Sequence, residues 1–217
     1  MGSWGRRGSL LLVAALLTAS GQARATTVRS VSVRQMLAGS EFVFEGRVLE
    51  VHTETGAMRG AIRTCAQFQV IEVIKGPPGT RSVELCFAGG AYGGLVLEVS
   101  GMVYPKVGEH GLYFVETLRR PLVHPLYGWE QGHFRIEPNE EGGPDIVKSA
   151  DGHPVLSLNE DHPSGAAPRH PGIAAGVGIE EALSAAERSK TAQGAMSPLS
   201  PEAFKARLHE LLGASRP

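Results

Sequence analysis

Hydrophobic and polar residues alternate with a period of two through much of residues 41–148, which is the pattern of half-buried β-strands. In 62–74 the apolar residues occupy mainly even positions, and in 81–87 they occupy odd positions. Gly- and Pro-rich turns separate seven such stretches, at 41–52, 62–74, 81–87, 95–100, 111–118, 129–137 and 145–148. Many short strands with turns between them predict a mainly β fold, either a barrel or a sandwich.

The first of these strands contains a change of phase. Phe42, Phe44 and Val48 share one face, whereas the later apolar residues Leu49 and Val51 do not keep that alternation. A glycine lies inside the stretch, at position 46. We therefore expect a bulge or bend in this strand near the glycine.

A helix is predicted on each side of the β-rich region. Ser32 and Gln35 have the spacing of a capping box, and Gly39 provides an end for a short N-terminal helix. Residues 200–213 begin with Ser-Pro, an N-cap followed by proline at the first helical position. Their apolar stripe predicts a C-terminal helix that docks on the β-domain or on a partner, and it consists of Phe204, Leu208, Leu211 and Leu212.

Four segments follow from these patterns. Residues 1–25 have a positively charged start, a short apolar stretch and an Ala-x-Ala end, and they are predicted to be a secretory signal peptide. Residues 26–158 form the β-domain, and 200–213 form the C-terminal helix. Between them, 159–199 is a low-complexity linker rich in Pro, Gly and Ala, with a helix predicted at 179–190.

Composition and charge exclude some classes of partner. The chain has 21 basic and 22 acidic side chains, and cleavage after residue 25 would remove three arginines and no acid. A nearly neutral to mildly acidic protein has no charge-based reason to bind nucleic acid or anionic lipid. The sequence therefore predicts an exported protein, periplasmic or secreted, that binds no nucleic acid and does not insert in the membrane after cleavage.

Cys65 and Cys86 are the only cysteines, and both lie on the polar side of adjacent predicted strands. A turn centred on Lys75-Gly76 would place them opposite each other, whereas a turn centred on Pro77-Pro78 would leave them diagonal and too far apart to bond. Because export favours oxidation, we expect a disulfide.

No catalytic motif is apparent. The chain has neither a Gly-x-Ser-x-Gly elbow nor a His-Glu-x-x-His sequence, and the glycine run at 89–94 is predicted to be a flexible turn. Glu109-His110 is also predicted to lie in a turn. Five of the eight histidines lie in the Pro- and Gly-rich region 124–170, without metal-ligand spacing. We therefore nominate no catalytic residue, metal ligand or cofactor, and the candidate binding rim consists of Tyr92, Tyr104, Tyr127 and Trp129.

The order of these segments resembles that of a group of uncharacterised exported bacterial proteins with an OB-like β-barrel. The resemblance covers about residues 31–158 and rests on segments 38–40, 42–48, 68–76, 88–90, 99–101, 107–115 and 128–134. It implies an OB-like barrel, closed or partly open, similar to that of tissue inhibitors of metalloproteinases and netrin-like modules. Those inhibitors use an N-terminal cysteine, whereas cleavage here would expose Thr26, so their inhibitory mechanism is not carried over.

The expected function is that of an exported, non-enzymatic protein that binds a protein partner in the cell envelope or outside the cell. A protease is one candidate partner. Two alternatives remain open at the level of sequence. One is a hydrolase whose site is assembled from the histidine-bearing loops, and the other is a carrier of a small ligand or metal at the barrel mouth.

Overall fold

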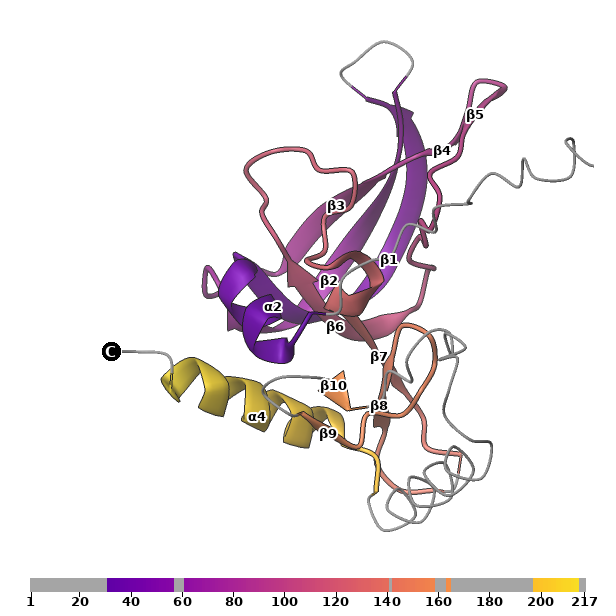
Figure 1. The fold of residues 1–217 in the computed structure, drawn as a ribbon. Helices are drawn as coiled ribbons and strands as arrows, with labels where there is room; N and C mark the ends of the chain where they lie inside the picture. Colours follow the sequence, from indigo (N-terminus) through magenta and orange to yellow (C-terminus); the bar gives the residue numbers. More distant parts are fainter. Residues whose placement is uncertain (1–30, 57–60, 141, 159–162, 165–196, 215–217) are drawn as a thin grey trace, which may run out of the picture.

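The computed structural model describes residues 31–56, 61–140, 142–158, 163–164 and 197–214 (Figure 1). The predicted signal peptide and the helix predicted at 179–190 lie outside these residues and stay predictions. The described chain is mainly β, and its elements are α2 (Val33–Gly39), β1 (Phe42–Thr55), β2 (Ile62–Lys75), β3 (Ser82–Ala88), β4 (Gly90–Tyr92), β5 (Leu95–Leu97), β6 (His110–Val115), the 3-10 helix η1 (Trp129–Gly132), β7 (His133–Glu137), β8 (Ile146–Ser149), β9 (Ser157–Leu158), β10 (Pro163–Ser164) and α4 (Pro201–Ala214).

Six strands form one antiparallel sheet in the order β3-β2-β1-β6-β7-β8. Two small two-stranded sheets, β4-β5 and β9-β10, complete the β structure of the described residues. The edge strands β3 and β8 are not paired with each other, so the described residues do not form a closed barrel. The mainly β prediction is confirmed, together with a short helix before the sheet and a longer helix after it.

The bend expected in the first strand is present. The register between β1 and β2 shifts between Val43 and Phe44, between Glu45 and Gly46, and again near Val48. A Cβ at Gly46 would lie 2.8 Å from the Gln69 carbonyl oxygen, so the close approach of the two strands requires glycine here.

The sheet has a hydrophobic core on each face. One core is rich in aromatic rings and lies within the β1-β2-β3-β6 part, where it comprises Phe42, Phe44, Val48, Ala66, Phe68, Leu85, Phe87, Tyr113, Val115 and Leu126. The other core lies between the sheet and both helices and includes Val33, Met36, Leu37, Val43, Leu112, Phe114, Phe134, Val147, Phe204, Leu208 and Leu211. Strand β1 contributes to both cores because its successive side chains point to opposite faces.

The C-terminal helix docks on the sheet. Phe204, Leu208 and Leu211 of the predicted stripe are buried, and the ring of Phe204 lies 4.9 Å from that of Phe134 in β7. The fourth residue, Leu212, packs against the same core while partly exposed. Leu199 fixes the approach to the helix through two backbone hydrogen bonds, because its carbonyl accepts from the Val147 amide of β8 and its amide donates to the Val155 carbonyl.

Two local predictions were wrong. Residues 129–132 form a 3-10 helix, and the strand begins only at His133, because Gly128 and Trp129 adopt positive φ angles of 68° and 62°. The glycine run at 89–94 is not a simple turn, because Gly90–Tyr92 forms β4 and pairs with β5. Only Gly93 and Gly94, with φ angles of 56° and 80°, connect the two strands.

Candidate functional site

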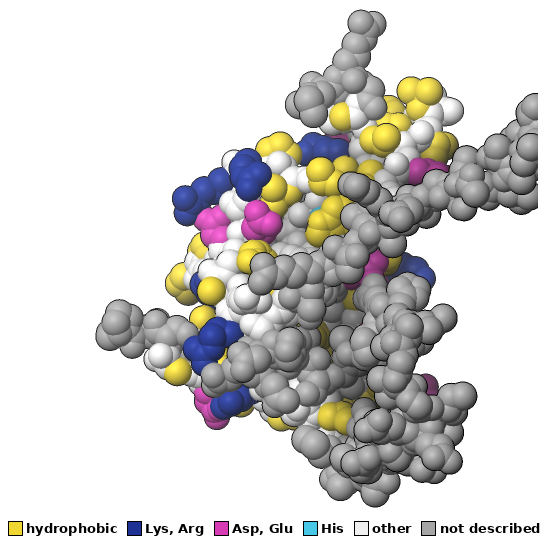
Figure 2. Space-filling view, in the orientation of Figure 1, with side chains coloured by type: hydrophobic (Ala, Val, Ile, Leu, Met, Phe, Trp, Pro, Cys, Tyr) yellow, Lys and Arg dark blue, Asp and Glu magenta, His cyan; other side chains and the backbone are white. Residues whose placement is uncertain are grey.

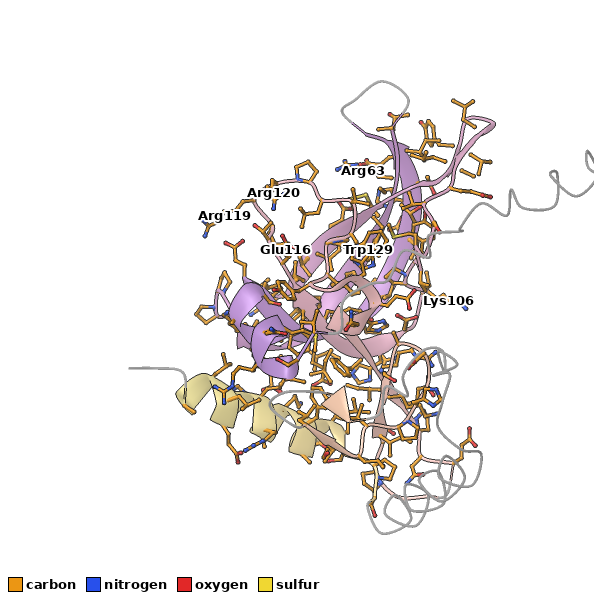
Figure 3. All side chains as sticks on the ribbon, in the orientation of Figure 1. Arg63, Lys106, Glu116, Arg119, Arg120 and Trp129 are labelled. Carbon is orange, nitrogen blue, oxygen red and sulfur yellow. A yellow bond between two sulfur atoms is a disulfide. The ribbon has the colours of Figure 1, made fainter. Side chains whose placement is uncertain are left out.

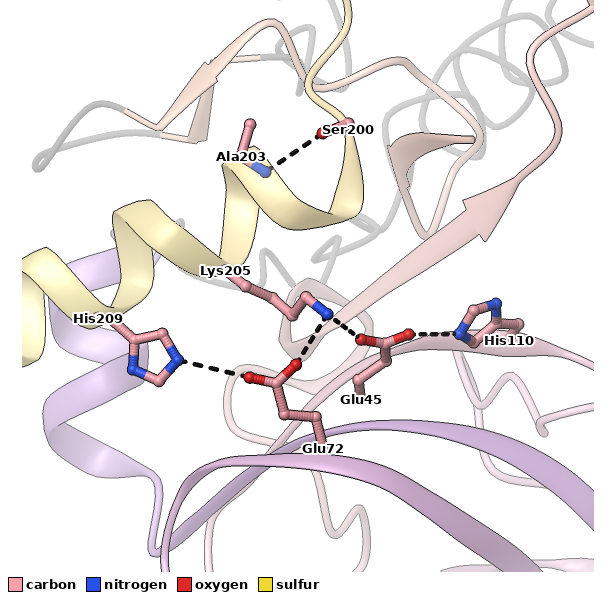
Figure 4. A network of polar contacts seen from close by, with 7 residues as sticks. All are labelled: Glu45, Glu72, His110, Ser200, Ala203, Lys205 and His209. Carbon is pink, nitrogen blue, oxygen red and sulfur yellow. Dashed lines mark hydrogen bonds and ion pairs between the residues drawn. The ribbon is translucent and has the colours of Figure 1, made fainter. Parts of the chain in front are cut away.

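A cluster of charged groups connects α4 to the sheet (Figure 4). The Lys205 ammonium donates hydrogen bonds to Glu45 Oε2 at 2.6 Å and to Glu72 Oε2 at 2.8 Å. The second oxygen of Glu45 lies 2.8 Å from His110 Nε2, and His209 Nε2 lies 3.7 Å from Glu72 Oε1. Strands β1, β2 and β6 thus each supply one member, and α4 supplies two.

The burial of this cluster makes its charges interdependent. The side chain of Glu45 is only 7% exposed, and its hydrogen bonds with His110 and then Lys205 hold the pKa of its carboxyl below the usual value. Burial alone would lower the pKa of Lys205, but the hydrogen bonds with Glu45 and Glu72 raise it. Each carboxylate oxygen described here already has a partner, so the cluster holds α4 in place rather than offering a free acid or base.

A second cluster of polar side chains lies at β6 and β7. Glu109 Oε1 is 3.4 Å from the Tyr113 hydroxyl and 3.3 Å from His133 Nε2. The rings of Tyr113 and His133 stack with their centres 4.6 Å apart. Burial raises the pKa of Glu109 and lowers that of His133 to about 3, so the imidazole is neutral. The prediction of a turn at Glu109-His110 missed both clusters, because His110 begins β6 and its side chain faces β1.

The predicted disulfide is confirmed. Cys65 and Cys86 are bonded, and they are directly opposite each other in the β2-β3 pairing. This register is the one expected for a hairpin centred on Lys75-Gly76 rather than on the prolines. Cys65 is fully buried although it lies on the outer, polar face of β2, and Glu54 Oε1 lies 3.6 Å from its sulfur.

Replacing both cysteines with alanine is expected to lower the free energy of unfolding by about 3 kcal/mol. The bridge spans 21 positions, and closing a loop of this size constrains the unfolded chain by that amount in the chain-entropy model. Urea denaturation of the double variant and of the oxidised protein measures the difference. Equal unfolding midpoints in the two proteins would contradict the expectation.

The four residues of the candidate binding rim lie in different environments. Tyr92 is 48% exposed on β4, whereas Tyr127 is partly buried and packs against Gly39 of α2. Tyr104 donates a hydrogen bond to the Ala88 carbonyl at 3.1 Å and lies edge-on to the Phe87 ring. The four residues therefore do not form one exposed ring of aromatic side chains.

Trp129 belongs to a row of contacting rings, stacked at one end and edge-to-face further along, rather than to the hairpin. Its ring lies 5.1 Å from that of His124, and His124 in turn lies 5.0 Å from Phe87. Because Phe87 also contacts Tyr104, two of the four predicted rim residues are joined through this row. Figure 3 shows Trp129 away from the β4–β5 hairpin, and Tyr92 is therefore the rim residue on that hairpin.

The β4–β5 hairpin carries a contiguous group of exposed apolar side chains. Leu95 is 64% exposed and Val96 is 69% exposed, and both faces of the small sheet carry apolar residues. Hydrophobic side chains gather at the end of the molecule where this hairpin lies (Figures 1 and 2). The sequence offers a signal for this surface in Leu-Val-Leu at 95–97, where apolar residues follow one another without alternation. We call the exposed side chains of Tyr92, Leu95, Val96 and Leu97 the hairpin surface.

Among the described residues, the histidines of the 124–170 region do not come together in a hydrolytic or metal-binding site. His124 is buried with its pKa lowered to about 4 by burial, and its Nδ1 accepts a hydrogen bond from the Leu126 amide. His153 is exposed, and His162 and His170 lie outside the described residues. Within the described part of the chain, the one group of three side chains spaced to hold a metal ion is Glu54, Cys65 and Cys86. Both sulfurs of that group are engaged in the disulfide.

Comparison of the chain with protein-family models, with curated proteins and with solved structures finds no match. None of the described helices has the length and apolar character needed to cross a membrane.

Proposed function

We propose that this chain is an exported, non-enzymatic binding protein that contacts a protein partner through the hairpin surface. The observation that supports this proposal is the exposure of Tyr92, Leu95 and Val96 on a two-stranded sheet that projects from the six-stranded one. Contiguous exposed apolar side chains of this kind are typical of protein interaction sites. The partner is one that offers apolar side chains in return, in the envelope or outside the cell.

The composition of the hairpin favours protein over other macromolecules. Residues 89–100 contain no Lys or Arg and one acid, Glu98. Nucleic acids and anionic lipid surfaces are bound chiefly through basic side chains. An apolar, slightly acidic hairpin suits the apolar centre of a protein interface instead.

We further propose that the six-stranded sheet is a partly open, OB-like barrel. Strands β1, β2 and β3 follow one another as a meander, and β6 returns to pair with the free side of β1. This order, β6-β1-β2-β3, has the connectivity of a Greek key, which is the topology of OB folds. The resemblance of residues 31–158 to exported OB-like proteins agrees with it.

The export proposal rests on the N-terminal sequence pattern. N-terminal sequencing of the protein accumulated outside the cytoplasm of its native cell tests it, and the expected first residue is Thr26. A chain that still begins with Met1 and stays in the cytoplasm would overturn export without touching the binding proposal.

The binding proposal predicts that a charge in the hairpin surface abolishes capture of the partner. The full chain, the Val96→Glu variant and the Leu49→Glu variant are used as bait against the exported fraction of the native cell. Leu49 is the matched control, because it is an exposed apolar residue, 52% accessible, that lies on β1 outside the hairpin.

We expect one protein to be captured by the full chain and by Leu49→Glu, with at least about tenfold less recovered by Val96→Glu, because burying an unpaired charge costs more than 1.4 kcal/mol. Circular dichroism of all three baits checks that they are folded. Capture that is equal for the three folded baits, or absent for all of them, contradicts the role of the hairpin.

A further inference from the structure

The outer face of β1, β2 and β3 brings together residues whose chemistry the proposed binding function does not use. His52 of β1 is paired with Cys65 of β2, and Cys65 is paired with Cys86 of β3. Residues directly opposite each other on neighbouring antiparallel strands point to the same face. An imidazole and two sulfurs therefore lie in a row across three strands, half-exposed at its two ends.

Two carboxylates flank this row. Glu54 lies two residues from His52 on β1, and its Oε1 atom is 3.6 Å from Cys65 Sγ. Glu84 lies two residues from Cys86 on β3, with Oε2 4.0 Å from Cys86 Sγ and Oε1 4.0 Å from His52 Nε2. The ligand atoms of Glu54, Cys65 and Cys86 all lie within 4.8 Å of one another.

We propose that reduction of the Cys65–Cys86 disulfide creates a binding site for one Zn²⁺ ion. The ligands are the two cysteine sulfurs, a carboxylate oxygen of Glu54 and an imidazole nitrogen of His52. Two thiolates, one imidazole and one carboxylate form a four-coordinate set of the types that Zn²⁺ prefers. Glu84 Oε1 lies 4.0 Å from His52 Nε2, so a small movement would bring this carboxylate into position to orient the ring, as carboxylates do for metal-bound histidines.

The zinc site forms in two steps. A protein dithiol outside the cytoplasm gives two electrons and two protons to the disulfide and itself becomes a disulfide, which leaves two thiols at Cys65 and Cys86. Zn²⁺ then binds both sulfurs as thiolates and displaces their two protons into solvent. The oxidised protein holds no thiolate, so the metal affinity depends on the redox state of this one bond.

The local structure allows the necessary movement. The two sulfurs are bonded in the oxidised chain and have to separate to about 3.8 Å, the spacing of two ligands at about 2.3 Å in a tetrahedral zinc site. Rotation of the side chains provides this on the outer face, where Cys86 is partly exposed on an edge strand. Arg63 pairs with Glu54, so its guanidinium competes with the metal for that carboxylate.

The test uses the full chain in the form that the cell accumulates, reduced with a water-soluble phosphine, which takes up the oxygen of one water molecule as it converts the disulfide to two thiols. Zn²⁺ is titrated by calorimetry, and Co²⁺ serves as a spectroscopic probe. We expect one Zn²⁺ per reduced chain and a thiolate-to-cobalt charge-transfer band. The oxidised chain is expected to show neither.

Matched variants separate this site from adventitious binding. His52→Ala is expected to weaken Zn²⁺ binding by at least about tenfold, since even changes outside the ligand set cost that much in zinc proteins. The control is His153→Ala, which removes an exposed histidine outside these strands. Cys86→Ser is expected to remove the cobalt band.

Three results would overturn the proposal. They are the absence of stoichiometric binding to the reduced chain, equal affinities of His52→Ala and His153→Ala, and equal binding by the oxidised chain. Circular dichroism follows folding, because reduction is expected to destabilise the chain. A reduced chain that is unfolded and refolds on addition of Zn²⁺ supports the site, and one that Zn²⁺ does not refold argues against it.

Discussion

Replacing Lys205 with Met is expected to lower the free energy of unfolding by about 3 kcal/mol at pH 7.5. The Lys205 side chain is 15% exposed and its ammonium is bonded to two carboxylates, of which the Glu45 side chain is 7% exposed. Methionine keeps the length and apolar stem of lysine but leaves the Glu45 charge without its cation in a place that water scarcely reaches. Loss of one partner of a buried ion pair is far more costly than loss of both.

The double variant Lys205→Met with Glu45→Gln is therefore expected to recover most of that loss. Glutamine removes the stranded charge and keeps a hydrogen-bonding side chain toward His110. Urea denaturation of the parent, both single variants and the double variant gives the coupling energy. A double variant that is as unstable as the sum of the single ones would show that the two side chains do not act as a pair. Arg207→Met, at a partly exposed position of α4, serves as the control for the helix itself.

The second large effect is a loss of stability on acidification. Burial lowers the pKa of His133 to about 3 and that of His124 to about 4, against 6.5 for an ordinary histidine. At a pH between the lowered pKa of each histidine and 6.5, that imidazole is protonated in the unfolded chain but neutral in the folded chain. Each histidine therefore removes stability as the pH falls through 6.5, with a slope that approaches about 1.4 kcal/mol per pH unit roughly one unit lower.

Two carboxyl groups modify this dependence of stability on pH. The raised pKa of Glu109 means that the folded chain takes up a proton earlier than the unfolded chain, which opposes the histidines. The lowered pKa of Glu45 adds to the loss below the usual carboxyl range. We expect a net loss of about 3 kcal/mol between pH 6.5 and pH 4.5.

Denaturation midpoints measured across this range at constant ionic strength check the expectation. His133→Gln is expected to reduce the slope by about half, whatever its effect on absolute stability, because glutamine does not titrate. His153→Gln, at an exposed position, is expected to keep the full slope. A stability that is constant or rises on acidification would mean that the two imidazoles are not held neutral by the fold.

Local patterns predicted the elements that depend on neighbouring residues. The polar–apolar alternation in β2 and β3 and the apolar stripe of α4 each lie within a short stretch of sequence. Cys65 and Cys86 belong to one hairpin, so the two predicted strands were enough to predict their disulfide. The sequence did not predict the register between β2 and β3, because Lys75-Gly76 and Pro77-Pro78 are both good turn sequences. In the structure Lys75 is still the last residue of β2, and its Nζ donates to the Leu37 carbonyl at 2.5 Å and to the Ser40 carbonyl at 2.7 Å, which are contacts that the sequence around the turn does not indicate.

The charged cluster under α4 could not be found in the same way. Lys205 is 160 positions from Glu45 and 133 from Glu72, and His110 is 65 positions from Glu45. No periodic pattern connects residues at such separations. One local signal does exist, because Val43 and Glu45 share the face of β1 opposite Phe42 and Phe44, which indicates that this face is covered by another element.

The shared core of α2 and α4 has a consequence for the order in which the protein can fold. Val33 and Met36 of the first described helix are buried in the same cluster as Phe204 and Leu208 of the last. A chain that leaves the ribosome, or any channel, N-terminus first must keep this apolar surface uncovered until α4 has emerged. A shortened chain that ends before residue 201 would therefore leave this apolar surface uncovered, as would the nascent chain until α4 has been synthesised, and uncovered apolar surface of this kind favours aggregation.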